Sequence, residues 1–135
     1  MASSAAALLD DESRAQRFEG GTFVTIYLSP RHYHRIHAPC SGTIPFARHV
    51  PGALLPVNAP GVAHIPDLFP RSERVVCMID GPNGRVAVVA VGAYNVGRIS
   101  TAFDDEWAGA GSSVANRGAH SAETRRYDPP RPVRQ

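Results

Sequence analysis

Residues 74–91, Arg-Val-Val-Cys-Met-Ile-Asp-Gly-Pro-Asn-Gly-Arg-Val-Ala-Val-Val-Ala-Val, decide the fold, because they read as two strands joined by a tight turn. The arms are apolar over Val75–Ile79 and Val86–Val91, and Gly81–Gly84 lies between them. Glycine, proline and asparagine supply the backbone angles that a hairpin turn needs. Since both arms are apolar on both faces, we expect the hairpin to occupy the centre of a covered sheet.

The chain upstream of the hairpin favours short strands over long helices. Eight prolines lie between Pro30 and Pro70, and proline interrupts helices. Segments rich in β-branched and aromatic residues, bounded by turn residues, are typical of strands. On this basis strands are predicted upstream of the hairpin near Thr22–Leu28, Thr43–Val50 and Ala53–Val57, and one downstream of it near Val96–Phe103.

A helix and a tail frame these strands. Residues 4–18 predict an N-terminal helix that Ser3 or Ser4 caps. After Trp107 small and polar residues with prolines dominate, so we expect a flexible, disordered tail at 108–135 behind a domain at 1–107. The predicted fold is mainly β (α+β), with an N-terminal helix followed by short strands in a sandwich- or barrel-like sheet.

The composition is that of one globular domain. Of the 135 residues, 43% are hydrophobic and 19% are charged, and a net charge of +2 is too small to indicate nucleic acid. No apolar run reaches the roughly 20 residues of a membrane-spanning helix. We expect no secretory signal, and reduced thiols at Cys40 and Cys77 in a cytosolic setting.

Every basic residue in the chain is an arginine. The 14 residues counted as lysine or arginine include no lysine, which excludes an amine nucleophile or Schiff base formed by a lysine of this chain. Arginine suits the recognition of carboxylate or phosphate. A genomic preference for arginine codons is the plainer explanation of the bias.

Most of the chemistry of the sequence is concentrated at residues 27–39. The stretch holds three of the six histidines, with two tyrosines and two arginines. One interpretation is acid–base catalysis by His34 and His37, with Arg35 holding an anion. A second is a metal site built from His32, His34 and His37, although no carboxylate lies nearby to orient an imidazole. A third is that the histidines pack and hydrogen-bond with no further role.

Two other segments have plainer interpretations. The two glycines of Val91–Gly97 do not belong to a phosphate-binding loop, and we expect them to mark a bulge or a close backbone approach. The charged run Leu68–Arg74 is expected to form a surface network of arginine and glutamate.

Short motifs in colinear order along residues 8–107 resemble those of the phosphatidylserine decarboxylases. The tyrosine–histidine–arginine core is the most specific of them. The motifs are Phe18–Phe23, Ile26–Arg31, Tyr33–Pro39, Val50–Gly52 with Leu55–Asn58, Leu68-Phe69 with Arg71 and Glu73-Arg74, and Val91–Ala93 with Asn95–Gly97.

The resemblance implies a pyruvoyl enzyme of phospholipid synthesis, made as a zymogen that cleaves itself before a serine in a Leu-Gly-Ser-Thr-like motif. That serine becomes the pyruvoyl group of the small subunit. The pyruvoyl carbonyl forms a Schiff base with the amine of phosphatidylserine and acts as an electron sink while CO2 leaves. The product is phosphatidylethanolamine. The implied partners are phosphatidylserine, a pyruvoyl-bearing small subunit and the membrane surface, with no nucleic acid. The implied location is cytoplasmic, peripheral at the inner face of the cell membrane.

The resemblance also implies roles for single residues. His37 matches the histidine of an Asp–His–Ser set that activates the serine for self-cleavage, and His34 matches a histidine near the pyruvoyl group that handles a proton. Which of the two does which task stays open. Tyr33 and Arg35 are expected to bind or support the headgroup, and no metal is implied.

Several family features are missing from the sequence. His32 stands where the family usually has aspartate, and Ser72 where it has asparagine. No Leu-Gly-Ser-Thr motif occurs, and the nearest string, at residues 111–113, lacks its leucine and threonine. We therefore expect a truncated large-subunit segment that is inactive alone, with the aspartate partner of His37 upstream of Met1. The alternatives are a non-catalytic remnant or interaction module and a metal-binding protein.

Overall fold

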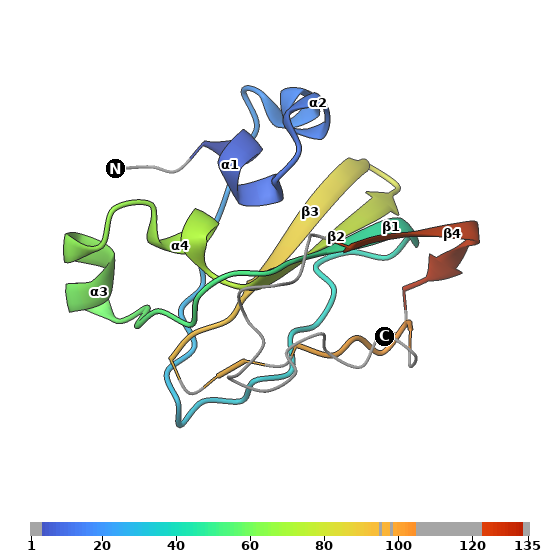
Figure 1. Ribbon diagram of the computed structural model, residues 1–135. Coiled ribbons are helices and arrows are strands. Elements are labelled where there is room, and N and C mark those ends of the chain that lie inside the picture. The colour runs from blue at the N-terminus through green and yellow to red at the C-terminus, as the bar shows by residue number, and fades with distance from the viewer. Residues whose placement is uncertain (1–3, 95, 98, 105–122, 134–135) are drawn as a thin grey trace.

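The computed structural model describes residues 4–94, 96–97, 99–104 and 123–133. Four antiparallel strands form one sheet in the order β3-β2-β1-β4, with short helices around it (Figure 1). The mainly β class is confirmed. The elements in chain order are α1 (Ala5–Leu9), α2 (Glu12–Ala15), the 3-10 helix η1 (Gln16–Phe18), β1 (Thr43–Val50), α3 (Ala59–His64), α4 (Leu68–Arg71), β2 (Arg74–Gly81), β3 (Gly84–Val91) and β4 (Glu123–Pro132).

The predicted hairpin is confirmed as β2 and β3. Its register runs from Arg74 opposite Val91 to Gly81 opposite Gly84. The position predicted for it is right for β2, which lies between β1 and β3. The predicted central position is wrong for β3, which is an edge strand of the sheet that the structure describes. The apolar residues of β3 are partly buried there without a strand on both sides.

The helix predicted over residues 4–18 is divided into α1, α2 and η1. The Ser4 side chain caps α1 by accepting a hydrogen bond from a backbone N–H three residues later. Asp10 then takes a left-handed backbone with φ 53°, and the Asp11 side chain caps α2. Short acidic side chains favour helix ends over helix interiors, and this explains why a run of good helix formers does not continue as one helix.

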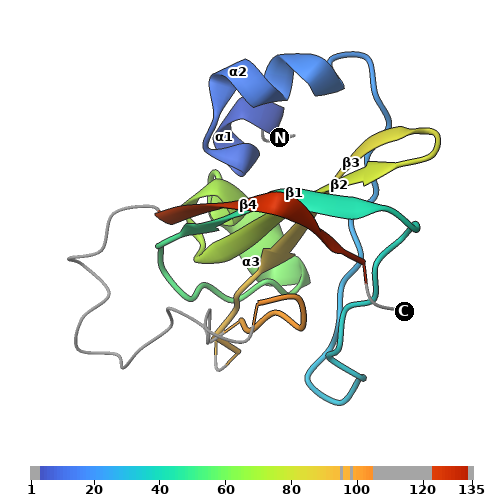
Figure 2. The same ribbon diagram turned by 90° about the vertical axis from the view of Figure 1, so that its right-hand side faces the viewer.

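The main core lies between the sheet and the first two helices. Leu9 and Ala15 of the helices pack against Phe46 of β1 and against Val76 and Met78 of β2. All five are buried, and Figure 2 shows α1 and α2 together on one side of the sheet. Burying an apolar side chain of the larger sizes stabilises the fold by about 1.5–3 kcal/mol, so this cluster holds the helices in place.

Arg74, the first residue of β2, ties the helices to the sheet. Its guanidinium donates to the carbonyl oxygens of Ala7 and Leu8 in α1 at 2.9 and 2.7 Å. It also donates to those of Pro70 and Ser72, in and after α4, at 2.6 and 3.0 Å. Burial lowers the pKa of Arg74, which is only 2% exposed. A buried cation therefore satisfies carbonyls at helix ends, where positive charge is favoured.

The opposite face of the sheet has a smaller cluster. Ala47 of β1 and Val75 of β2 are covered by Ile99, Phe103 and Tyr127. Phe103 and Tyr127 pack edge to face with their ring centroids 5.9 Å apart. The segment after β3 and strand β4 therefore close this face together.

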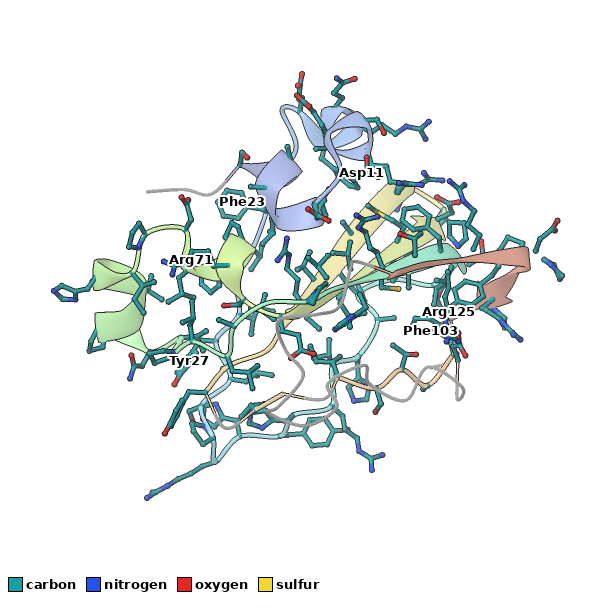
Figure 3. The ribbon with its side chains drawn as sticks, in the orientation of Figure 1. Asp11, Phe23, Tyr27, Arg71, Phe103 and Arg125 are labelled. Carbon is teal, nitrogen blue, oxygen red and sulfur yellow. The ribbon has the colours of Figure 1, made fainter. Side chains whose placement is uncertain are left out.

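Asp104 fixes that cover in place. The buried carboxylate accepts hydrogen bonds from the Tyr127 hydroxyl at 2.8 Å and the Arg125 guanidinium at 3.2 Å. Burial and the bond to Asp104 raise the pKa of Tyr127. Phe103 and Arg125 lie close together below the sheet, on the side away from Asp11 (Figure 3).

Strand β4 corrects the prediction of a flexible tail over residues 108–135. Within that range, residues 123–132 pair with β1, from Glu123 opposite His49 to Pro132 opposite Thr43. The register shifts between Ile44 and Phe46, and the prolines at 129 and 130 lie opposite this irregularity. Prolines are tolerated at edge strands and bulges, which is why this segment pairs despite its composition. Residues 108–122 and 134–135 lie outside the described residues.

Strand β1 confirms the prediction at Thr43–Val50, but the other three predicted strands do not form. Residues 22–28 are extended without a ladder, and the segment Ala53–Val57 contributes only a bridge between Ala53 and Ser72. The segment Val96–Phe103 contributes only isolated bridges, and its residue 98 lies outside the described residues. Apolar alternation marks a segment that suits a sheet, but pairing also requires a neighbouring strand in register.

Candidate active site

The candidate site lies on the long segment between η1 and β1. Residues 19–42, all of which the structure describes, form neither helix nor strand. The segment runs from the helices to the opposite end of the molecule, where residues around Tyr33–His37 form a loop (Figures 1 and 2). Tyr33, His34, Arg35 and His37 are all exposed, so the predicted site is an open surface and not a cleft of the described chain.

A tight turn leads into this loop. The His32 N–H donates to the Ser29 carbonyl at 2.8 Å, and the Ser29 N–H donates to Nδ1 of His32 at 3.2 Å. Pro30 occupies the second position of the turn, where its fixed φ is favourable. The His32 side chain is therefore engaged in shaping the backbone.

His34 is held in one tautomer by a backbone contact. Its Nδ1 lies 2.6 Å from the His32 carbonyl oxygen. Because a carbonyl can only accept, Nδ1 carries the proton, and Nε2 of the neutral ring keeps its lone pair. An exposed imidazole in this form can take up and return a proton at Nε2.

Tyr33 and His37 are brought together by the loop. The Tyr33 hydroxyl lies 3.0 Å from Nε2 of His37, and the two rings are stacked with centroids 5.7 Å apart. Arg35 makes no hydrogen bond or ion pair with any described residue, so its guanidinium is available to an anion. Of the four predicted site residues, Tyr33 and His37 therefore contact each other. His34 and Arg35 are exposed beside them.

The set of three histidines proposed as a metal site is not assembled. Among the described residues, no three histidine, cysteine, aspartate or glutamate side chains gather closely enough to hold a metal ion. Nδ1 of both His32 and His34 is already engaged with the backbone.

The motifs around Gly52, Glu73 and Gly92 meet at a junction where β1 and β3 end and β2 begins. The backbone of Ala53 accepts from the Glu73 N–H at 2.9 Å and donates to the Arg71 carbonyl at 3.0 Å. The Gly92 N–H donates to the Glu73 carbonyl at 2.7 Å. A Cβ on Gly52 would lie 2.6 Å from the Arg71 carbonyl oxygen, and one on Gly92 would meet Leu54 at 3.0 Å. The expected close backbone approach at Gly92 is confirmed.

Sequence reasoning missed a buried pair at this junction. Nε2 of His49 lies 3.1 Å from a carboxylate oxygen of Glu73, and the residues are 4% and 6% exposed. Glu73 and Arg74 were predicted to lie in a surface network, and that prediction is wrong because both side chains are buried. The only sequence signal was a histidine inside the segment Thr43–Val50, which was predicted to form a strand. No hydrogen bond joins the pair to the Tyr33–His37 loop among the described residues.

The comparisons with known proteins bear on the resemblance directly. A family model described as phosphatidylserine decarboxylase matches residues 1–134. The chain belongs to the phosphatidylserine decarboxylase family. The predicted resemblance is confirmed, and the match extends beyond residues 8–107 and includes β4.

Curated relatives have the same family name. The chain is 43% identical over 118 residues to the phosphatidylserine decarboxylase proenzyme of Methylococcus capsulatus, covering 87% of this chain and 41% of that protein. It is 52% identical over 99 residues to the proenzyme of Bordetella petrii, covering 73% of this chain and 33% of that protein. The chain thus spans about two fifths or less of the length of these relatives. In the described residues, no helix is long and apolar enough to cross a membrane.

Proposed function

We propose that this chain supplies the histidine-bearing part of a phosphatidylserine decarboxylase site, which converts phosphatidylserine to phosphatidylethanolamine and CO2. The observation that carries the proposal is the exposed loop at Tyr33–His37 in a chain of this family. Its imidazoles and guanidinium offer proton transfer and anion binding on one surface. Phosphatidylserine presents an amine, a carboxylate and a phosphate, which are the groups that such a surface can recognise.

The residues of the loop fit a pyruvoyl group contributed by another segment. The group supplies a carbonyl that withdraws electrons from the amino acid carbon of the substrate. Since the chain contains no lysine and no Leu-Gly-Ser-Thr motif, neither a lysine amine nor that serine precursor comes from its sequence. The exposed His34, Arg35 and His37 leave room for such a group, because no described segment covers them.

Each residue of the loop has a distinct task in this proposal. Nε2 of His34 holds or delivers a proton at the substrate carbon, since Nδ1 is committed to the backbone. His37 acts as the base that activates the serine during self-cleavage, and the Tyr33 hydroxyl orients its ring through the 3.0 Å contact. Arg35 binds the carboxylate or phosphate of the substrate.

The partners and location follow from the proposed reaction. The chain acts together with a pyruvoyl-bearing small subunit, at the inner face of the cell membrane, where the lipid headgroup is presented. Its relatives are named proenzymes, which supports a processed pair of subunits.

A chimera tests the proposal. The 118 matching residues of the Methylococcus capsulatus proenzyme are replaced by those of this chain, and self-cleavage and CO2 release from phosphatidylserine are measured. We expect His37→Ala to leave one uncut chain. We expect His34→Ala to be cut but to release CO2 about 100-fold more slowly, the usual contribution of a proton-transfer group.

The matched control is His64→Ala. His64 is also exposed and bonds the backbone through Nδ1, but it lies on α3. The proposal is wrong if the His34 and His37 variants behave like this control, or if the unaltered chimera neither cleaves nor decarboxylates.

A non-catalytic interaction module is the second candidate function. It is favoured by the apolar edge of β3 and the exposed apolar residues of the long segment, which promote association. Size-exclusion chromatography of the purified chain distinguishes it: a cooperatively melting monomer contradicts self-association.

A further inference from the structure

The segment Thr22–Leu28 carries an unusual amount of exposed apolar surface. Phe23, Val24 and Ile26 are 79%, 79% and 78% exposed, and Tyr27 is 50% exposed. Figure 3 shows Phe23 near the helices and Tyr27 farther along the same segment. Because successive side chains of an extended chain point to opposite sides, both sides of this segment are apolar. Such a segment is suited to the interior of a sheet that is covered on both faces.

The backbone of this segment also lacks partners among the residues that the structure describes. None of the described residues forms a hydrogen bond with the backbone or side chains of Thr22–Leu28. The segment is nonetheless extended, which is the conformation that a strand needs before it pairs. Within the described part of the chain, its N–H and C=O groups are therefore free on both edges, and its apolar side chains lie on both faces.

These two properties together favour a polypeptide over a lipid as the partner that covers this segment. A lipid surface covers apolar side chains but cannot satisfy free backbone groups, whose burial in hydrocarbon is costly. A neighbouring strand satisfies both requirements at once. The length of the relatives shows that such polypeptide exists in the family, since the aligned part is 41% of the Methylococcus capsulatus protein and 59% lies outside it.

We infer that Thr22–Leu28 becomes a paired strand by adding to a sheet formed by the part of the decarboxylase polypeptide that this chain does not align with. This inference rests on the proposed function, because it assumes that the chain works with that polypeptide. His34 follows Leu28 by six residues, a span of at most roughly 20 Å. Strand addition therefore brings the Tyr33–His37 loop to the partner that carries the carbonyl.

The experiment co-produces this chain with the two Methylococcus capsulatus polypeptides that flank the aligned 118 residues. Amide hydrogen exchange of Thr22–Leu28 is compared between the chain alone and the complex. We expect the amides to exchange freely in the chain alone and at least about tenfold more slowly in the complex, as paired strands do.

Variants test pairing without disturbing the fold. Ile26→Pro removes an N–H that bonds none of the described residues. We therefore expect the melting temperature to stay unchanged and the affinity for the flanking polypeptides to fall at least about tenfold. Val24→Asp is expected to weaken the complex similarly. Val62→Asp, an exposed valine on α3, is the matched control and is expected to have no effect.

Several outcomes overturn the inference. One is a complex in which the amides of Thr22–Leu28 exchange as freely as in the chain alone. Another is that the chain associates with itself and Ile26→Pro abolishes this association. A third is that the chain binds phosphatidylserine vesicles and Ile26→Pro abolishes this binding. CO2 release is measured on the same samples. A protected complex that releases no CO2 supports strand addition and contradicts the proposed function, whereas CO2 release without protection contradicts strand addition alone.

Discussion

Replacing Arg74 by alanine is expected to be highly destabilising. The side chain makes four hydrogen bonds to the carbonyl oxygens of Ala7, Leu8, Pro70 and Ser72. Hydrogen bonds from a charged group contribute about 1.5–3 kcal/mol each, or roughly 6–12 kcal/mol in total. Desolvation of the buried guanidinium costs several kcal/mol and offsets part of this sum, leaving a net loss of about 3–5 kcal/mol.

Urea unfolding followed by circular dichroism measures this loss. For a domain of this length the same change lowers the melting temperature by roughly 10–20 °C. Arg74→Lys is expected to fall between the wild type and alanine, because an ammonium group cannot reach carbonyls on both helices at once.

Arg85→Ala is the matched control for this experiment. Arg85 also bonds a neighbour on the hairpin, but its partner Asp80 has a side chain that is 42% exposed. Exposed pairs contribute about 0–1 kcal/mol, so this variant should lose little stability. A loss below about 1 kcal/mol for Arg74→Ala, similar to that of Arg85→Ala, would refute the role assigned to Arg74 in holding α1 and α4.

Three further changes test other parts of the structure by the same unfolding assay. Glu73→Ala leaves His49 buried without its partner and should lower the free energy of unfolding by about 2–4 kcal/mol. Glu73→Gln should lower it less because glutamine keeps an acceptor. Equal losses in the two variants would contradict this prediction. Gly52→Ala places a Cβ 2.6 Å from a backbone oxygen and should cost at least about 1–3 kcal/mol, and an unchanged midpoint would show that the junction adapts. Burial tends to raise the pKa of Asp11, but hydrogen bonds from the backbone N–H and side chains of the next residues lower it from 3.8 to about 2. The stability that Asp11 contributes should therefore be complete above about pH 4 and lost as the pH falls toward 2. Asp11→Ala should cost about 1 kcal/mol at pH 7 and remove this pH dependence. A mutant whose stability falls with acid as that of the wild type does would contradict this prediction.

The elements predicted correctly from the sequence are those whose signals are local. The hairpin at 74–91 has a turn of glycine, proline and asparagine between two apolar runs, and Ser4 precedes good helix formers. The glycines of Val91–Gly97 follow an apolar strand and were expected to mark a bulge or a close backbone approach, and the close approach is found at Gly92. The Tyr33–His37 stretch was singled out by its composition and its resemblance to the family, and its role as a site stays a prediction.

The features that sequence reasoning missed depend on distant parts of the chain. Strand β4 pairs with a strand about 80 residues away, and its prolines are tolerated only because they lie at an irregular edge. Arg74 and the His49–Glu73 pair are charged or polar side chains whose burial is decided by tertiary packing. The extended segment at 22–28 has the pattern of a strand, but none of the described strands pairs with it.

The most direct test of the central claim is CO2 release from phosphatidylserine, measured for the purified chain alone and together with the flanking polypeptides of the Methylococcus capsulatus proenzyme. We expect no release from the chain alone. We expect the complex to release CO2 in a reaction that hydroxylamine inhibits. We expect this release to be about 100-fold slower in His34→Ala and unchanged in His64→Ala. Hydroxylamine-sensitive release from the isolated chain, or full activity of the His34→Ala complex, would contradict the claim that this chain contributes the histidines and another segment the carbonyl.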